Sequence, residues 1–256
     1  MLSILNYKQF GEGETVVFLH GFLESISMWE KLSLESIHFQ SILIDLPGHG
    51  ESKNEDNSQV PSIDYMANRV IETLNQLGIK KYHVVGHSMG GYVALVLKKI
   101  DVRCEKVILL NSNFWEDSAE KQKDRIRVAD IVFKNKNLFL KEAIPNLYND
   151  QVKYKEEITA LLSEALKMEA FSIAYASLAM SKRLDFSELI IHKPSDFVIV
   201  QGEIDAIVPR LIMESKEALK KVPYYLIKNT GHMSHFENPS EIHQLLIKEL
   251  GSLERN

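Results

Sequence analysis

Short runs of apolar residues, rich in Val and Ile, recur along the chain and alternate with stretches of helical periodicity. The runs are nearly continuous, which is typical of strands that are covered on both faces of a parallel sheet. They lie at residues 15–19, 41–46, 82–85, 106–110, 197–200 and 224–227. The pattern therefore predicts a set of buried strands at the centre of the fold.

Between the second and third runs, Ser62 can cap a helix that Gly78 ends. Its apolar residues follow one another at intervals of three or four, as on one buried face: Ile63, Met66, Val70, Leu74 and Leu77. This strand, helix, strand order predicts an α/β fold, with a mostly parallel twisted sheet and helices on both faces.

A long helical stretch interrupts this order before the last two strands. No glycine occurs from residue 92 to residue 201, and the later part of that span has helical spacing, for example at Ile158, Leu161 and Ala165. We expect a helical insertion at residues 115–192 in a core made of residues 1–114 and 193–256. Open α/β sheets bind ligands beyond the carboxyl ends of their strands, so the insertion should also cover the site.

Composition narrows the classes of function. Of the 256 residues, 45% are apolar and 25% charged, the balance of a globular protein. The formal charge of −5 comes without a basic stripe, which argues against nucleic acid as a partner. Cys104 is the only cysteine, no Cys/His cluster has metal-ligand spacing, and neither a signal peptide nor a run of eighteen apolar residues is found. These features predict a soluble, cytoplasmic protein without a membrane span.

The sharpest chemical motif is Gly86-His87-Ser88-Met89-Gly90-Gly91, which directly follows the run at residues 82–85 and precedes a helical stretch. A strand that turns abruptly into a helix brings backbone segments close together, and glycines on either side leave room for this approach. We interpret Ser88 as a nucleophile exposed at that turn.

A serine hydroxyl needs a base and a group that orients the base. His232 follows the last strand, and we prefer it to His235, for which we expect a structural hydrogen bond. Asp205 follows the preceding strand and leads into an apolar loop, where a buried carboxylate can fix an imidazole tautomer. We prefer Asp205 to the neighbouring Glu203, which we expect to be exposed.

Acyl transfer also needs donors for the developing oxyanion. The backbone N–H of Met89, at the start of a helix, is one candidate. The N–H of Phe22, in the His20-Gly21-Phe22 turn after the first buried strand, is the other. We expect the ring of His20 to organise this turn through hydrogen bonds and to transfer no proton.

The order Ser88, Asp205, His232, together with His20-Gly21-Phe22, resembles the α/β-hydrolase fold superfamily over nearly the whole chain. The resemblance includes the segment from Asp45 to Ser52, whose role in the superfamily is structural. It implies about eight strands, the second of them antiparallel, a helical cap, and neither a metal nor an organic cofactor.

Within the superfamily the chain resembles carboxylesterases, carbon–carbon bond hydrolases and the menaquinone-pathway synthase, a lyase. In that synthase an arginine comes directly after the paired glycines, whereas this chain has Tyr92 at that position. We expect a serine hydrolase of small or medium carboxylic esters that acts as a monomer or homodimer. The alternatives are a carbon–carbon hydrolase, a lyase, or a slow-turnover ligand receptor.

Overall fold

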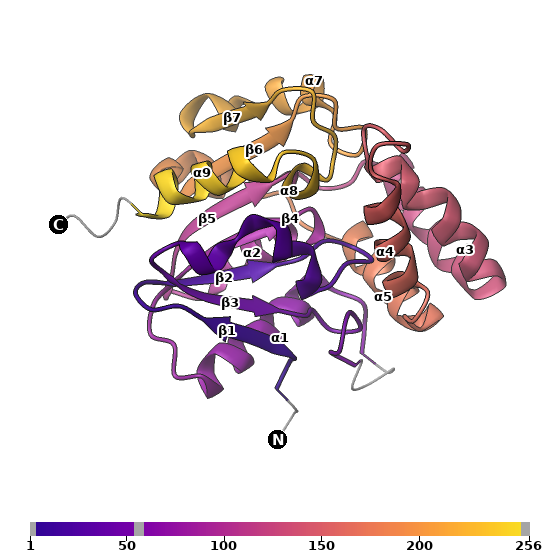
Figure 1. The fold of residues 1–256 in the computed structure, drawn as a ribbon, viewed down its shortest axis with the longest axis horizontal. Helices are drawn as coiled ribbons and strands as arrows, with labels where there is room; N and C mark the ends of the chain where they lie inside the picture. Colours follow the sequence, from indigo (N-terminus) through magenta and orange to yellow (C-terminus); the bar gives the residue numbers. More distant parts are fainter. Residues whose placement is uncertain (1–3, 54–58, 252–256) are drawn as a thin grey trace.

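The computed structural model describes residues 4–53 and 59–251, and a seven-stranded sheet lies at its centre (Figure 1). The strand order is β1-β3-β2-β4-β5-β6-β7, and all neighbours are parallel except β1 and β3. The strands are β1 (Tyr7–Phe10), β2 (Thr15–Leu19), β3 (Gln40–Ile44), β4 (Tyr82–His87), β5 (Cys104–Leu110), β6 (Phe197–Gly202) and β7 (Tyr224–Ile227). The predicted α/β fold with a mostly parallel sheet is confirmed.

The number of strands differs from the eight that the resemblance implied. The described residues form seven, and the antiparallel strand is the first, β1. The residues just before β1 bond to a helix and a loop: Leu5 N–H donates to Thr73 Oγ1 in the helix Ile63–Gln76 (3.2 Å), and Asn6 N–H donates to Ser52 Oγ in the loop after β3 (2.9 Å). The carbonyl of Asn6 accepts from Asp45 N–H (3.0 Å). Backbone groups used in this way are not available for the ladder of a further strand.

Helices cover both faces of the sheet. The α-helices among the described residues are α1 (Ile63–Gln76), α2 (Met89–Ile100), α3 (Ala119–Ala143), α4 (Lys155–Ala165), α5 (Ala170–Ser181), α6 (Ser187–His192), α7 (Arg210–Glu214), α8 (Ser234–Glu237) and α9 (Pro239–Leu250). A 3-10 helix, η1 (Ile26–Leu32), follows β2, and another, η3 (Pro145–Leu147), follows α3.

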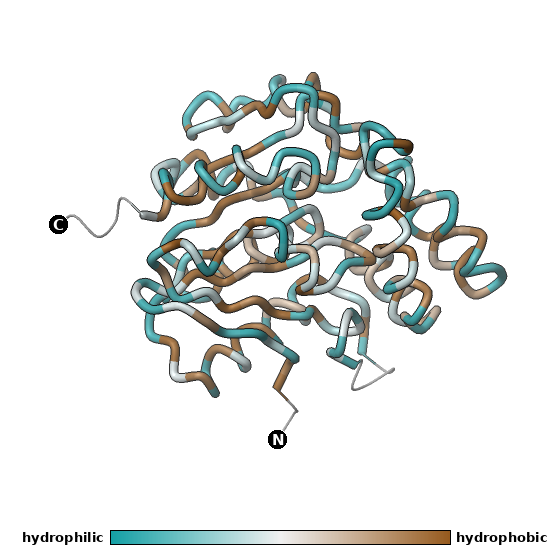
Figure 2. The backbone as a smooth tube through the Cα atoms, in the orientation of Figure 1, coloured by the Kyte–Doolittle hydropathy of each residue, from teal (hydrophilic) through white to brown (hydrophobic). Residues whose placement is uncertain are grey.

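Side chains of the central strands alternate between two apolar cores. Val17 and Leu19 of β2 pack with α1 and α2, whereas Val16 and Phe18 pack with η1 and α9. The same alternation recurs in β4, β5 and β6, because successive side chains of a strand point to opposite faces. Figure 2 shows the hydrophobic backbone concentrated along these central strands. The continuous apolar runs in the sequence therefore reflect a sheet that is buried on both sides.

Helix α1 forms as its sequence predicts. The side chain of Ser62 accepts a hydrogen bond from Tyr65 N–H (3.0 Å) at the helix start, and Met66 and Val70 are fully buried. Gly78 takes a φ of +71° just after the helix, a conformation that few other residues adopt.

Helices α3, α4 and α5 lie between β5 and β6 in the sequence and stand to one side of the sheet (Figure 1). They share an apolar cluster of their own, to which Ile158, Leu161 and Ala165 of α4 contribute. Parts of α5 and α6 also reach the main core: Ile190 of α6 packs beside α1 and α2, and so do Tyr175, Ala176, Ala179 and Met180 in the later part of α5. We call α3 to α5, with their connections, the insertion. In the described ranges, no helix is both long enough and apolar enough to cross a membrane.

Candidate active site

Ser88 lies at the sharp turn between β4 and α2. Its φ is +49° with ψ −113°, a strained conformation for a residue with a side chain. The turn depends on its glycines: a Cβ on Gly86 would collide with the backbone of Gly90, and a Cβ on Gly90 would collide with the carbonyl oxygens of Leu19 and His20. Ser88 itself remains half-buried. The backbone thus presents the hydroxyl at the carboxyl end of the sheet.

His232 lies on the loop between β7 and α8 and meets Ser88 there. Its Nε2 is 2.9 Å from Ser88 Oγ, and its Nδ1 is 2.9 Å from Asp205 Oδ2. Its backbone N–H donates to Leu147 O of η3 (3.2 Å). The structure therefore brings the three residues predicted from the sequence into one hydrogen-bonded chain.

Asp205 follows β6 and is buried among donors. Its Oδ1 accepts from the backbone N–H groups of Ile207 (2.8 Å) and Val208 (2.9 Å). Its Oδ2 accepts from Asn111 Nδ2 (3.0 Å) and Gln201 Nε2 (3.2 Å), in addition to the histidine. These fixed donors hold the carboxylate in one orientation.

The donors also keep this acid ionised. Burial alone would raise the pKa of Asp205, but the charge of His232 and the hydrogen bonds from His232, Val208 and Asn111 hold it below its ordinary value. An ionised Asp205 favours the tautomer of His232 that carries its proton on Nδ1 and leaves Nε2 free to accept from Ser88.

The two predicted oxyanion donors lie on either side of this turn. Met89 N–H is in the first turn of α2, and Phe22 N–H belongs to the turn after β2. Among the described residues, neither N–H has a hydrogen-bond acceptor. Both groups are therefore available to a ligand.

His20 fixes the peptide that carries the Phe22 N–H. Its Nε2 accepts from Leu46 N–H (2.9 Å), so its proton is on Nδ1, which lies 2.8 Å from the carbonyl oxygen of Gly21. That carbonyl and the Phe22 N–H belong to one planar peptide group. Burial lowers the pKa of His20, which agrees with a neutral ring. The expected structural use of His20 fits these contacts.

The prediction for His235 was wrong. Both of its ring nitrogens are buried and, among the described residues, have no hydrogen-bond partner. The ring packs instead against aromatic rings, with centroids 4.6 Å from His87, 4.5 Å from Phe236 and 5.8 Å from Trp29. Burial lowers the pKa of His235 well below its usual value. It therefore acts as a neutral aromatic side chain.

The remaining residues considered from the sequence take structural positions. Glu203 is half-exposed and accepts from Asn229 N–H (3.0 Å), whereas the carboxylate that bonds to His232 is that of Asp205. Asp45 accepts from Ile26 N–H (2.8 Å) and Glu51 N–H (2.9 Å) and organises the loop after β3.

Sequence reasoning missed two side chains that support the acid. Asn111, directly after β5, donates to Asp205 and also to the carbonyl of Gly231 (3.0 Å), while its Oδ1 accepts from Ser234. Gln201 is the penultimate residue of β6. The signal that could have found them is position, because both lie at the carboxyl ends of central strands next to the acid.

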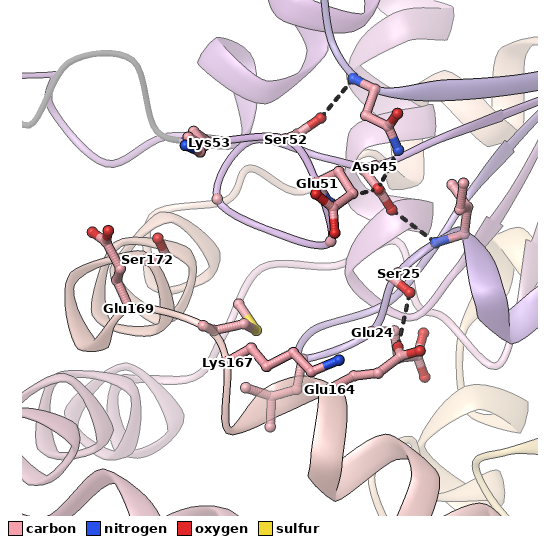
Figure 3. Close-up of a pocket in the computed structure, with 16 residues that line it drawn as sticks. Glu24, Ser25, Asp45, Glu51, Ser52, Lys53, Glu164, Lys167, Glu169 and Ser172 are labelled. Carbon is pink, nitrogen blue, oxygen red and sulfur yellow. Dashed lines mark hydrogen bonds between the residues drawn. The ribbon is translucent and has the colours of Figure 1, made fainter.

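A cavity of about 400 Å³ lies between the loops of the core and the α4–α5 junction (Figure 3). Carboxylates dominate its wall, including Asp45, Glu51 and Glu164, while Lys53 and Lys167 also line it. Ser88 and His232 do not belong to its lining. The cavity therefore borders the Phe22 turn through Leu23 and Glu24 and is not the reaction centre itself. Within residues 4–53 and 59–251, no group of three or more His, Cys, Asp or Glu side chains is arranged to hold a metal ion.

Comparison with known proteins places this geometry in context. A model of the alpha/beta hydrolase family matches residues 16–245. The solved structure of a thermophilic esterase from Thermogutta terrifontis superimposes with a TM-score of 0.86 and 28% identity, over 97% of this chain and 93% of that one.

Two curated relatives have other names. The 2-succinyl-6-hydroxy-2,4-cyclohexadiene-1-carboxylate synthase of Citrobacter koseri is 25% identical over 89% of this chain and 90% of its own length. The dihydrolipoyllysine-residue acetyltransferase component of the acetoin cleaving system of Cupriavidus necator is 29% identical over 94% of this chain. This chain spans only 64% of the length of that protein.

Proposed function

Because the chain belongs to the alpha/beta hydrolase family, we propose that it is a serine hydrolase that cleaves small or medium carboxylic esters through an acyl-enzyme on Ser88. The observation that carries the proposal is the hydrogen-bonded chain from Ser88 Oγ through His232 to Asp205, with both contacts at 2.9 Å. The similarity to an esterase structure at 28% identity supports the same chemistry.

In the proposed mechanism, His232 Nε2 takes the proton from Ser88 Oγ as the oxygen attacks the ester carbonyl. The N–H groups of Phe22 and Met89 hold the oxyanion, a contribution of roughly 3 kcal/mol for each donor. The imidazolium then gives its proton to the departing alcohol. Water, deprotonated by His232, attacks the acyl group, and the carboxylic acid leaves while Ser88 regains its proton.

We further propose that residues 115–192 form a cap over this site, with residues 1–114 and 193–256 as the core. Contacts between the insertion and the catalytic loop support this division, because Leu147 O binds the N–H of His232.

Carbon–carbon bond cleavage is the second candidate, suggested by the similarity to the Citrobacter koseri synthase. Arg183 lies with its guanidinium 4.2 Å from the centre of the Tyr92 ring, close to the position where that family branch is expected to have its arginine. However, Arg183 is buried in an ion pair with Asp117 (2.5 Å) and donates to Asn113 Oδ1 (3.2 Å). Asp117 also pairs with Arg125 (3.4 Å), so the guanidinium of Arg183 is held by internal partners, which argues against its binding a substrate carboxylate.

The test is steady-state hydrolysis of a series of nitrophenyl esters of increasing acyl length. We expect turnover by the wild type and a loss of about 10⁴-fold or more in Ser88→Ala, because the nucleophile is gone while the fold is kept. Ser215→Ala, at an exposed serine, should match the wild type.

Retention of most activity in Ser88→Ala would refute the proposed nucleophile. Absence of turnover by folded wild type would favour the lyase or the slow ligand receptor. The receptor would show ligand-dependent stabilisation of the insertion without multiple turnover.

A further inference from the structure

A second buried pair of charged side chains lies behind the catalytic residues. Glu24 follows the Gly21–Phe22 turn, and His87 is the last residue of β4, directly before Ser88. Their exposed fractions are 2% and 0%. The mechanism above gives neither of them a role, and buried charges are rare unless they are paired.

The contacts of His87 fix its protonation. Its Nδ1 lies 3.0 Å from Glu24 Oε2, and its Nε2 lies 3.0 Å from the main-chain oxygen of His232. Glu24 Oε2 also accepts from Gly21 N–H (2.5 Å), and this second donor favours an ionised oxygen there. Because both nitrogens of the ring face acceptors, each must donate, and only an imidazolium donates from both.

The electrostatics agree with this assignment. Burial would lower the pKa of His87, but the charge and hydrogen bond of Glu24 raise it above the ordinary value. Burial would raise the pKa of Glu24, but His87 lowers it to about 2. The other titratable groups that face His87 are His20, His232, His235 and Asp205. Glu24 is the only carboxylate among the described residues that bonds directly to the ring.

We propose that Glu24 is a positioning residue whose ion pair with His87 holds three parts of the site together: the Gly21–Phe22 turn, the nucleophile turn at Ser88 and the main chain of His232. The proposal rests on the proposed function of Ser88. It follows from connectivity, since one carboxylate oxygen joins the Gly21 N–H to His87, and His87 joins that oxygen to the carbonyl of His232.

Removal of the negative charge of Glu24 should break part of this hydrogen-bonded connection. In Glu24→Gln, the amide cannot neutralise an imidazolium, so His87 should become neutral. The amide atom in the Oε2 position can then either accept from Gly21 N–H or donate to His87 Nδ1, and one of the two links is lost. The oxyanion donor and the base then lose their fixed separation, while the surface that contacts the substrate keeps its composition. We expect kcat to fall about 10- to 100-fold with KM nearly unchanged.

Two variants make the comparison specific. Glu24→Asp keeps the charge and should recover part of the lost kcat. Glu30→Gln removes an exposed carboxylate six residues further along and should leave both constants unchanged. A kcat of Glu24→Gln equal to that of the wild type would overturn the proposal, and so would an increase in KM alone.

A spectroscopic measurement does not depend on activity. In protein with ¹⁵N-labelled histidine, both ring nitrogens of His87 should remain protonated above the ordinary histidine pKa of about 6.5, and His87→Gln identifies the signals. In Glu24→Gln the ring should be neutral at about pH 7. A neutral His87 in the wild type at that pH would refute the ion pair.

These measurements separate the two proposals. Wild-type protein without ester turnover, but with a protonated His87, would contradict the proposed function and leave the ion pair standing. If Glu24→Gln does not fold, the NMR titration of the wild type and the kinetics of Glu24→Asp still decide the matter. In that case, a neutral His87 in the wild type at about pH 7 would by itself overturn the proposal.

Discussion

Asp205 receives five hydrogen bonds on its two oxygens, and only the donor His232 takes part in the proposed proton transfer. The other four donors come from side chains and backbone that stay in place during the reaction. The role of the acid is thus to fix the tautomer and direction of the imidazole ring.

Replacement of this acid by its amide tests the role. In Asp205→Asn the amide N–H can donate to His232 Nδ1, which places the histidine proton on Nε2. A protonated Nε2 cannot accept the proton of the Ser88 hydroxyl. We expect kcat for ester hydrolysis to fall by about 10⁴-fold. Glu203→Gln, two residues away, should leave the rate unchanged. Equal losses in both variants would contradict the assignment.

At the residue scale, the sequence predicted site residues where the chemistry accepts only a few residue types. Serine between glycines, an acid after one strand and a histidine after the next predicted residues that the structure brings into contact. Asn111 and Glu24 gave no comparable signal, because an amide or a carboxylate in a loop has many uses. Their roles depend on which backbone groups the fold places beside them.

At the scale of elements, the insertion is tied to the loop that carries His232, the proposed base. The carboxylate of Glu237, in α8, accepts from Gly231 N–H through Oε2 (2.7 Å) and from Asn149 N–H through Oε1 (3.2 Å). Asn149 Nδ2 also donates to Asn229 O (2.5 Å). Glu237 therefore joins the segment after η3 to the loop before α8.

Glu237→Gln should loosen this junction, because an amide offers one acceptor oxygen where the carboxylate offers two. We expect faster hydrogen exchange at the amides of Asn149 and Gly231, and a loss of up to about tenfold in kcat for ester hydrolysis. Glu241→Gln, on the exposed side of α9, is the matched control. Unchanged exchange at both amides would show that the carboxylate does not hold the junction.

The elements themselves were predicted unevenly. Continuous apolar runs predicted the buried strands. Strand β1 was not predicted, because three of its four residues are exposed and show no apolar pattern. The predicted insertion extended to residue 192, although Ile190 of α6 packs beside α1 and α2. Periodicity reports that one face of a helix is buried, and it does not report which part of the protein buries it.

At the scale of the whole molecule, buried histidines make stability depend on pH. Burial lowers the pKa of four of them, which are therefore neutral in the folded state near pH 7: His20, His49, His83 and His235. Each binds a proton on unfolding once the pH falls below the ordinary value of about 6.5. Acid then favours the unfolded state by at most about 1.4 kcal/mol per pH unit for each group, until the pH reaches the folded pKa of that group.

The contribution of the Glu24–His87 ion pair to stability is lost at both low and high pH. Because the pKa of Glu24 is lowered, its contribution is complete above the ordinary glutamate value and is lost as pH falls toward about 2. Because the pKa of His87 is raised, its contribution is complete below about 6.5 and is lost as pH rises through its folded value. The free energy of unfolding should therefore be greatest near neutral pH.

His235→Phe isolates one of these contributions. The ring has no hydrogen bond to lose among the described residues and lies against other aromatic rings, so phenylalanine should fit. Urea unfolding between about pH 5 and about pH 6 should show a slope smaller by about 1.4 kcal/mol per pH unit than in the wild type. His192→Phe, at an exposed histidine, should keep the wild-type slope. An unchanged slope in His235→Phe would mean that His235 is protonated in the folded protein.

The hydrogen bond between Ser88 and His232 joins residues 144 positions apart, and the acid comes from a third strand end. Contacts at such sequence separation form only after the intervening chain has closed its loops, and they are slow to form during folding. No segment of the chain contains the complete triad until β4, β6 and β7 are in register in one sheet. Chemical competence is therefore acquired together with the finished topology, and a partly folded chain or a fragment lacks it.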